Sequence, residues 1–440
     1  MRFSVMSRDL APADLEKTVK AAGGSNVRVE KLLKLVFCEL NEDQARRLSQ
    51  DSRLKVKQAR EMRSAEVAAP PVPVPTPFPG ADISLSDYHL LQSSDEDMQD
   101  TWDIFAGLRA LFEPPITGQG LTVAVLDSGV RKTHQSLLSR VVYEKNLTDS
   151  PGTGDVFNHG TQVAFAAAGM DSQGKAGVAP GACVMNIKVL SDEGLGTDET
   201  VVDGIEEVIE LIEQARSNGL HPTDPMFPNV INLSLGSEDD GDPDNPVRIA
   251  CREAVNTYGL DVVAAVGNEG PKMSTIMLPA VDELVIAVGG LESNWFTIWE
   301  KSARGPTLEG VTKPDFCLWA TDLEMASGKA DDEYVNKSGT SFSCPMVCGL
   351  YGLLWEVSRI QYGPDALFSW IAAREFAPYY CTKPADAVIK KDNTYGYGLP
   401  AMSSMVSQMA QAVSPLEQTV EMFQPVMMLG MMGVLVRGAF

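Results

Sequence analysis

Leu121-Thr-Val-Ala-Val-Leu-Asp127-Ser-Gly129 is an apolar, partly β-branched run of strand length that ends in a carboxylate. Gly120 and Gly129 bound this run, which predicts a strand buried on both faces of a parallel sheet. Open α/β sheets place their functional sites at the carboxyl ends of such strands. The sequence therefore predicts an α/β fold with Asp127 at the functional edge of the sheet.

Two further segments place a histidine and a serine at the starts of helices. Asn158-His159-Gly-Thr161 precedes an alanine-rich run, and Asn158 is expected to cap the helix that this run forms. Ser338-Gly-Thr-Ser341-Phe-Ser-Cys-Pro345 is expected to open a second apolar helix that runs to about Val357, with Pro345 in its first turn. A serine at a helix N-terminus offers a free backbone N–H and the positive end of the helix dipole to a developing oxyanion.

The order Asp, His, Ser supplies the three groups of a serine hydrolase. A serine hydroxyl attacks a carbonyl when a histidine removes its proton and a carboxylate orients that histidine. With these motifs the chain resembles the subtilisin-like serine proteases, or subtilases, whose triad follows this order. The resemblance covers most of the chain from Trp102 to Ala401 and implies a subtilisin-like three-layer domain with a mostly parallel sheet. It also implies that Asp127 orients His159, which takes the proton of Ser341 as the acyl-enzyme forms.

The same resemblance assigns the groups around the nucleophile. Asn268 is the expected side-chain donor of the oxyanion hole, beside the N–H of Ser341. Three residues of Asn232-Leu-Ser-Leu-Gly236 are expected to pair with the substrate's backbone: Ser234, Leu235 and Gly236. Glu269 is expected to approach the pocket for the residue before the scissile bond.

The residues before the proline-rich tether Ala68–Pro79 predict a domain of their own. Its expected elements have the order βαββαβ: a strand at Arg2–Met6, a helix at Pro12–Ala22, two strands in Val27–Leu40, a capping-box helix from Asn41 and a strand at Leu54–Ala59. This α+β order is ferredoxin-like and resembles the inhibitory prodomain of subtilases, the inhibitor I9 type. The expected division is a prodomain at 1–65, a proline-rich and acidic linker at 66–100, a catalytic domain at 101–402 and a methionine-rich extension at 403–440.

Opposite charges favour docking of the first domain on the rest. Residues 1–63 carry fourteen Lys and Arg against nine Asp and Glu, a net charge of +5, which leaves −28 for the rest of a chain of net charge −23. The prodomain is therefore expected to inhibit its own catalytic domain and to stay bound after cleavage, as in a zymogen. The resemblance puts the tail Gln58–Arg63 in the cleft as a product-like strand, and self-cleavage is expected between Arg63 and Pro75. The overall acidity argues against a nucleic-acid partner.

Acidic residues gather near the expected cleft. They are Asp192, Glu193, Asp198 and Glu199 in the loop after Lys188, and Glu238, Asp239, Asp240, Asp242 and Asp244 after the substrate-binding strand. With Glu269, such carboxylates favour protein or peptide substrates that carry Lys or Arg near the scissile bond. They also suit a structural calcium ion, although the Asp239–Asp244 spacing matches no EF-hand, and a solvated loop explains them equally well. The chemistry itself requires no cofactor.

No secretory signal opens the chain, and its seven scattered cysteines form no CxxC pair. This is typical of a protein that is cytoplasmic as synthesised, with export by an unconventional route as the open alternative. The uncharged run Pro425–Val436 is too short to span a bilayer as a helix, so no transmembrane span is expected. The extension is expected to dock on the catalytic domain, with binding of a partner through its methionines or contact with a membrane surface as the open alternatives.

Two other functions remain open on the same fold. An amine that replaces water at the acyl-enzyme would give a peptide ligase or cyclase, and a catalytically weak pseudoprotease would act as a binding scaffold. The intact triad and Asn268 favour the hydrolase. The chain departs from the family pattern at Gln162 and at Phe342-Ser-Cys344, and neither departure removes a catalytic group.

Overall fold

The computed structural model describes residues 1–400 except 8, 32, 66–100, 294–296, 375–376, 378–380 and 385–389. The expected linker at 66–100 and the methionine-rich extension at 403–440 therefore lie outside the described residues. Residues 1–58 are called the N-terminal unit below, and residues 101–400 the large unit.

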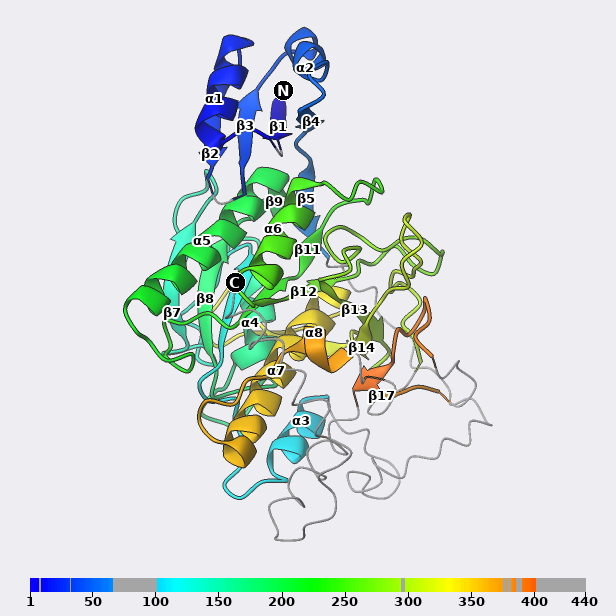
Figure 1. The fold of residues 1–440 in the computed structure, drawn as a ribbon. Coiled ribbons are helices and arrows are strands. Elements are labelled where there is room, and N and C mark those ends of the chain that lie inside the picture. The colour runs from blue at the N-terminus through cyan, green and yellow to red at the C-terminus, as the bar shows by residue number, and fades with distance from the viewer. Residues whose placement is uncertain are drawn as a thin grey trace.

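A seven-stranded sheet forms the centre of the large unit (Figure 1). In spatial order its strands are β14 (Phe316–Trp319), β13 (Ile286–Leu291), β12 (Asp261–Ala265), β10 (Val230–Leu233), β6 (Thr122–Asp127), β8 (Cys183–Lys188) and β7 (Val141–Asn146). Every neighbouring pair is parallel. Strand β6 is buried at every residue and ends at Asp127, so the predicted buried parallel strand is confirmed.

Helices cover both faces of this sheet, because successive side chains of a strand point to opposite faces. Val123 and Val125 of β6 belong to one apolar core with residues of α4 and α7, whereas Ala124 and Leu126 belong to a second core with residues of α5 and α6. The predicted three-layer α/β architecture is confirmed. The helices of the large unit are α3 (Thr101–Arg109), α4 (Gly160–Ala168), α5 (Asp198–Ser217), α6 (Pro246–Asn256), α7 (Thr340–Tyr362) and α8 (Trp370–Ala373).

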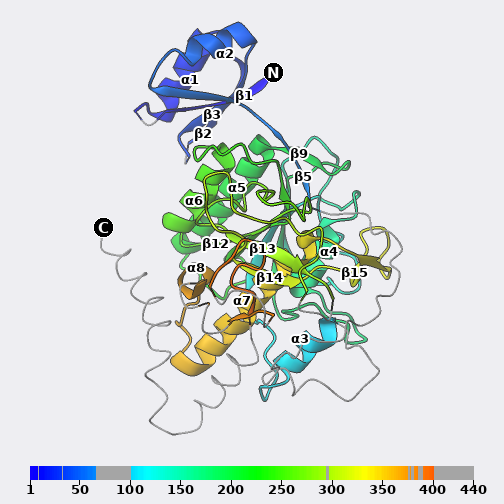
Figure 2. The ribbon, with the colours of Figure 1, turned by 90° about the vertical axis from the view of Figure 1, so that its right-hand side faces the viewer.

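The N-terminal unit forms a separate four-stranded antiparallel sheet backed by two helices (Figure 2). Its elements are β1 (Arg2–Ser7), α1 (Pro12–Ala21), β2 (Ser25–Glu30), β3 (Leu35–Glu39), α2 (Glu42–Leu48) and β4 (Leu54–Gln58). The spatial order β2-β3-β1-β4 with this chain order is the ferredoxin-like topology. Its own small core includes Val5, Leu15 and Val36, all fully buried.

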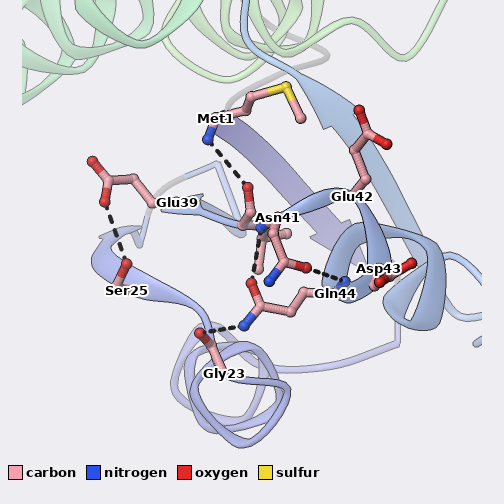
Figure 3. Close-up of a pocket in the computed structure, with 9 residues that line it drawn as sticks. Met1, Gly23, Ser25, Glu39, Asn41, Glu42, Asp43 and Gln44 are labelled. Atoms are coloured by element: carbon pink, nitrogen blue, oxygen red, sulfur yellow. Dashed lines mark hydrogen bonds between the residues drawn. The ribbon is translucent and has the colours of Figure 1, made fainter.

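The start of α2 follows from the capping box in the sequence (Figure 3). The N–H of Gln44 donates to Oδ1 of Asn41 at 2.9 Å, and the N–H of Asn41 donates to Oε1 of Gln44 at 2.8 Å. Nε2 of Gln44 also donates to the carbonyl of Gly23 at 2.9 Å, which ties α2 to the turn after α1. Local sequence therefore sets both the helix start and its packing on the neighbouring turn.

Strand β5 (Glu61–Ser64) leaves the N-terminal unit and enters the large unit (Figure 1). It lies between β11 (Leu235–Gly236) and β9 (Leu195–Thr197) and pairs with both in antiparallel fashion. Two further pairs of short strands complete the large unit: β15 (Leu323–Ala326) with β16 (Tyr334–Lys337), and β17 (Cys381–Thr382) with β18 (Leu399–Pro400).

Candidate active site

Asp127 and His159 form a buried hydrogen-bonded pair at the carboxyl edge of the central sheet. Oδ1 of Asp127 lies 2.7 Å from Nδ1 of His159, and the two side chains are 1% and 0% exposed. Gly160, which begins α4, allows this approach: a Cβ there would lie 2.2 Å from the carbonyl oxygen of Gly129 and 3.1 Å from Cβ of Asp127. A carboxylate in this position fixes the tautomer and the orientation of the imidazole ring.

The turn that carries His159 is built by Asp155, which sequence reasoning missed. One oxygen of its buried carboxylate accepts the N–H groups of Asn158 (2.8 Å) and His159 (3.2 Å), and the other accepts that of Thr161 (2.8 Å). The expectation that Asn158 caps α4 is wrong, because its φ of 76° turns it away from the helix and its Oδ1 accepts the N–H of Gly328 at 2.5 Å. The only local signal for Asp155 was an Asx residue a few positions before a helix.

Two donors converge on the carbonyl oxygen of Ala65, the residue that follows β5. Nδ2 of Asn268 donates to it at 2.6 Å, and the backbone N–H of Ser341 lies at 3.3 Å. The amide of Asn268 is oriented by Thr340, whose N–H and Oγ1 both lie 3.0 Å from its Oδ1. The geometry is that of a peptide carbonyl held in an oxyanion-type site beside a serine.

The backbone carbonyl of Ser341 in helix α7 has no helical donor, because the donor position is occupied by Pro345. The helix begins at Thr340 and runs to Tyr362, which is beyond the expected end. Because it begins at Thr340, Pro345 lies in its second turn, and the expectation that this proline lies in the first turn is wrong. Proline has no N–H for the carbonyl four residues before it, which is that of Ser341. Oγ of Ser234 donates to this carbonyl at 2.7 Å. Ser234, predicted to bind substrate, thus also stabilises the first turn of the helix that carries Ser341.

Strand β5 occupies the position expected for a substrate. Ser64 pairs with Leu235, and Arg63 pairs with Gly236 on one side and Leu195 on the other. The carbonyl of Ser234 accepts the N–H of Ala65 at 3.1 Å and also accepts Oγ of Ser341 at 3.2 Å. Three predicted residues, Ser234, Leu235 and Gly236, therefore bind an extended strand, which belongs to this chain itself.

Two of the predicted acidic residues are placed differently from expectation. Asp198 and Glu199 form the first turn of α5 instead of a loop. Asp192 lies 3.2 Å from Nζ of Lys188, Glu193 bonds Ser191 at 2.8 Å, and Glu269 is exposed after Asn268. Asp239 accepts the N–H of Gly241 at 3.0 Å.

Most of the remaining carboxylates are paired with basic residues of the N-terminal unit and of the segment before β5. Nε of Arg2 lies 2.6 Å from Glu199, and Nζ of Lys55 lies 2.7 Å from Asp242 and 2.9 Å from Asp244. Further ion pairs join Lys57 to Asp242, Arg60 to Asp240 and Arg28 to Asp203. The opposite net charges of the two parts therefore meet at specific ion pairs.

A cluster of buried carboxyl groups lies at the same interface, formed by Glu30 of β2 with Asp203 and Glu206 of α5. Arg28 pairs with Glu30 at 2.9 Å and also with Asp203. Burial raises the pKa of Asp203 to about 8, against the lowering effect of Arg28, and Glu30 and Glu199 raise it further. Burial, followed by the hydrogen bond to Glu30, raises the pKa of Glu206 to about 9. Docking therefore favours the protonated form of these two groups.

Binding of the N-terminal unit is expected to weaken as the pH rises. Undocked and exposed, the two carboxyl groups titrate near 4, so their own contribution to docking is fully present below that pH and is lost as the pH rises through 8 to 9. A dissociation constant measured on the cleaved pieces should rise at least roughly tenfold from pH 5 to pH 9, and Glu206→Gln should flatten the rise. A pH-independent constant, or an equal rise in the variant, would contradict this reading.

Within the described part of the chain, no group of three or more His, Cys, Asp or Glu side chains is arranged to hold a metal ion. The Asp239–Asp244 loop does not fit calcium here, because Asp240, Asp242 and Asp244 face lysine and arginine side chains. All seven cysteines are free. No described helix is long and apolar enough to cross a membrane.

Comparisons with known proteins identify the family of the large unit. A profile described as the subtilase family matches residues 118–398. Serine protease AprX of Bacillus subtilis (strain 168) is 31% identical over 277 residues, which are 57% of this chain and 59% of AprX, so less than two thirds of that relative is matched. Subtilisin DY of Bacillus licheniformis is 34% identical over 54% of this chain and 77% of its own length. The solved structure of sphericase superposes with a TM-score of 0.53 at 25% identity, covering 65% of this chain and 92% of sphericase.

Proposed function

The chain belongs to the subtilase family, and from this premise we propose that it is a serine endopeptidase made as an autoinhibited zymogen. In this proposal residues 1–65 are the inhibitory prodomain and Ser341 is the nucleophile. Protein or peptide segments that can adopt an extended strand between β9 and β11 are the substrates, since an added strand binds mainly through its backbone.

The observation that carries the proposal is the position of Ala65. Its carbonyl oxygen accepts hydrogen bonds from Asn268 (2.6 Å) and from the N–H of Ser341 (3.3 Å), while its own N–H is held by Ser234 (3.1 Å). These contacts hold the Ala65 carbonyl at the backbone N–H of Ser341, as a scissile or just-cleaved peptide requires. The bond between Ala65 and Glu66 is therefore the proposed site of self-cleavage, within the window expected from the sequence.

The proposed reaction uses the groups of the site in two acyl-transfer steps. His159 takes the proton of the Ser341 hydroxyl, which turns from the Ser234 carbonyl as it attacks the carbonyl carbon of Ala65. Asp127 stabilises the imidazolium through its 2.7 Å contact with Nδ1. The tetrahedral intermediate collapses to an acyl-enzyme as His159 gives the proton to the departing amine. Water, activated by His159, then releases the acid and regenerates Ser341.

Autoinhibition in this proposal rests on the ion pairs and the buried β5 contacts. The basic residues of the prodomain hold carboxylates on α5 and on the loop after β11, and Met62 of β5 is fully buried. The cut prodomain therefore stays bound as a product-like inhibitor until it is released or degraded. The experiment that tests the proposal is the N-terminal sequence of the self-cleaved chain, which is expected to begin at Glu66.

A preference for basic substrate residues remains part of the proposal. For the substrate positions next to the scissile bond, however, no described acidic side chain makes a contact that supports this preference. Glu269 is exposed, and Arg63, the third residue before the proposed scissile bond, is exposed as well. The carboxylates that were expected to select basic residues contact positions farther from the scissile bond. The basic preference is therefore expected to come from those distant positions.

A further inference from the structure

Arg60 precedes β5 and is held by the large unit through both its backbone and its side chain. The N–H of Asp198 donates to the carbonyl of Arg60 at 3.0 Å, and the N–H of Arg60 donates to Oδ2 of Asp198 at 3.3 Å. These bonds continue the pairing of β5 with β9 by one residue, because Glu61 already pairs with Thr197. Counting back from Ala65, Arg60 is the sixth residue before the scissile bond.

The guanidinium of Arg60 lies against two acceptors of the loop that follows β11. Nη1 donates to the carbonyl oxygen of Glu238 at 3.1 Å, and Nη2 forms an ion pair with the carboxylate of Asp240. The other oxygen of that carboxylate accepts the N–H of Asp242 at 3.1 Å, which fixes its orientation. The Arg60 side chain is 24% exposed and that of Asp240 is 40% exposed, so the guanidinium is partly shielded from solvent whereas the carboxylate is open to it.

We propose that Asp240 and the Glu238 carbonyl form a substrate subsite that selects arginine at the sixth position before the scissile bond. This inference rests on the proposed function and specifies the substrate class: extended protein segments with an arginine five residues before the residue that is acylated. Arg60 lies outside β4, and its hydrogen bonds with described residues are to the large unit, so a substrate chain on the same path meets the same acceptors after the prodomain has left.

The departure of the prodomain leaves Asp240 available to the substrate. Besides Arg60, the ion-pair partner of Asp240 among the described residues is Lys57, at 3.5 Å. Lys57 belongs to β4 and is removed together with the folded N-terminal unit. Arginine suits the subsite better than lysine, because its planar fork reaches the carboxylate and the carbonyl with two different nitrogen atoms, whereas lysine presents a single ammonium group.

The enzyme for the test is produced by self-cleavage of the full-length protein, followed by removal of the prodomain. Its substrates are acetylated and amidated peptides with the sequence of residues 60–67. The first residue is arginine, lysine or citrulline, a neutral analogue of arginine. The expected kcat/KM for the arginine peptide is about three to tenfold above that for citrulline, mainly through a lower KM, with lysine in between. The preference should shrink with added salt.

Two variants separate this subsite from general acidity. Asp240→Asn should bring the arginine-to-citrulline ratio close to one, whereas Asp242→Asn, the same change on the same loop at a residue that contacts lysines, should keep the ratio. Equal rates for arginine and citrulline at low salt, or an unchanged ratio in Asp240→Asn, would overturn the subsite and leave the endopeptidase in place. Failure to cleave any of the peptides would overturn the proposed function and this inference together.

Discussion

Ser341→Ala is expected to purify at full length and to hydrolyse peptides no faster than about one millionth of the wild-type rate. The reason is that no other group can form the acyl-enzyme, and the remaining oxyanion donors supply only a small residual acceleration. The fold should persist, because within the described part of the chain Oγ of Ser341 hydrogen-bonds the Ser234 carbonyl alone, at 3.2 Å, whereas the contacts that hold the turn use the backbone of Ser341. Intact mass and a peptide hydrolysis assay measure both effects.

A matched control distinguishes loss of the nucleophile from loss of the helix start. Ser343→Ala removes a hydroxyl two residues along, which donates to the Thr340 carbonyl at 3.0 Å, and it should still self-cleave. Self-cleavage of purified Ser341→Ala, with other proteases excluded, would reject Ser341 as the nucleophile.

Asn268→Ala is expected to lower kcat by about 10²–10³-fold with little change in KM. Its Nδ2 lies 2.6 Å from the Ala65 oxygen, where the proposed reaction develops negative charge in the transition state. Loss of one such donor costs about 2.7–4 kcal/mol of transition-state stabilisation, a magnitude known from subtilisin itself. Steady-state kinetics on the peptide of residues 60–67 measures the change.

Asn256→Ala is the control for this variant, because Asn256 is exposed at the end of α6. Its kinetic constants should match the wild type. If Asn268→Ala kept its kcat, or if the loss lay entirely in KM, the amide would be a ground-state binding group and its assignment to the transition state would be wrong.

The sequence predicted the elements whose signals are local. The apolar run before Asp127 gave strand β6, and the reciprocal pattern of Asn41 and Gln44 gave the start of α2. The βαββαβ order of the N-terminal unit could be predicted for the same reason, since each strand and helix carries its own periodicity and ends. The residues of the candidate site were predicted from short motifs next to recognisable elements: a strand before Asp127 and helices after His159 and Ser341.

Contacts between distant segments could be predicted only where the family resemblance implied them, as for Asp127 with His159. Asp155 organises the turn of His159, and Ser234 compensates for the missing N–H of Pro345, but neither role has a local pattern. The acidic residues were visible in the sequence, whereas their partners depend on how the N-terminal unit docks. Asp240, for example, meets Arg60, which is 180 positions away in the chain.

The central claim is that Ala65 is bound as the residue to be acylated by Ser341, and the masses of the self-cleavage products test it most directly. Wild-type protein, incubated alone and analysed intact under denaturing conditions, should yield one piece that ends at Ala65 and another that begins at Glu66, whereas Ser341→Ala should remain whole. A cut at another bond, or the same cut in Ser341→Ala, would contradict the account.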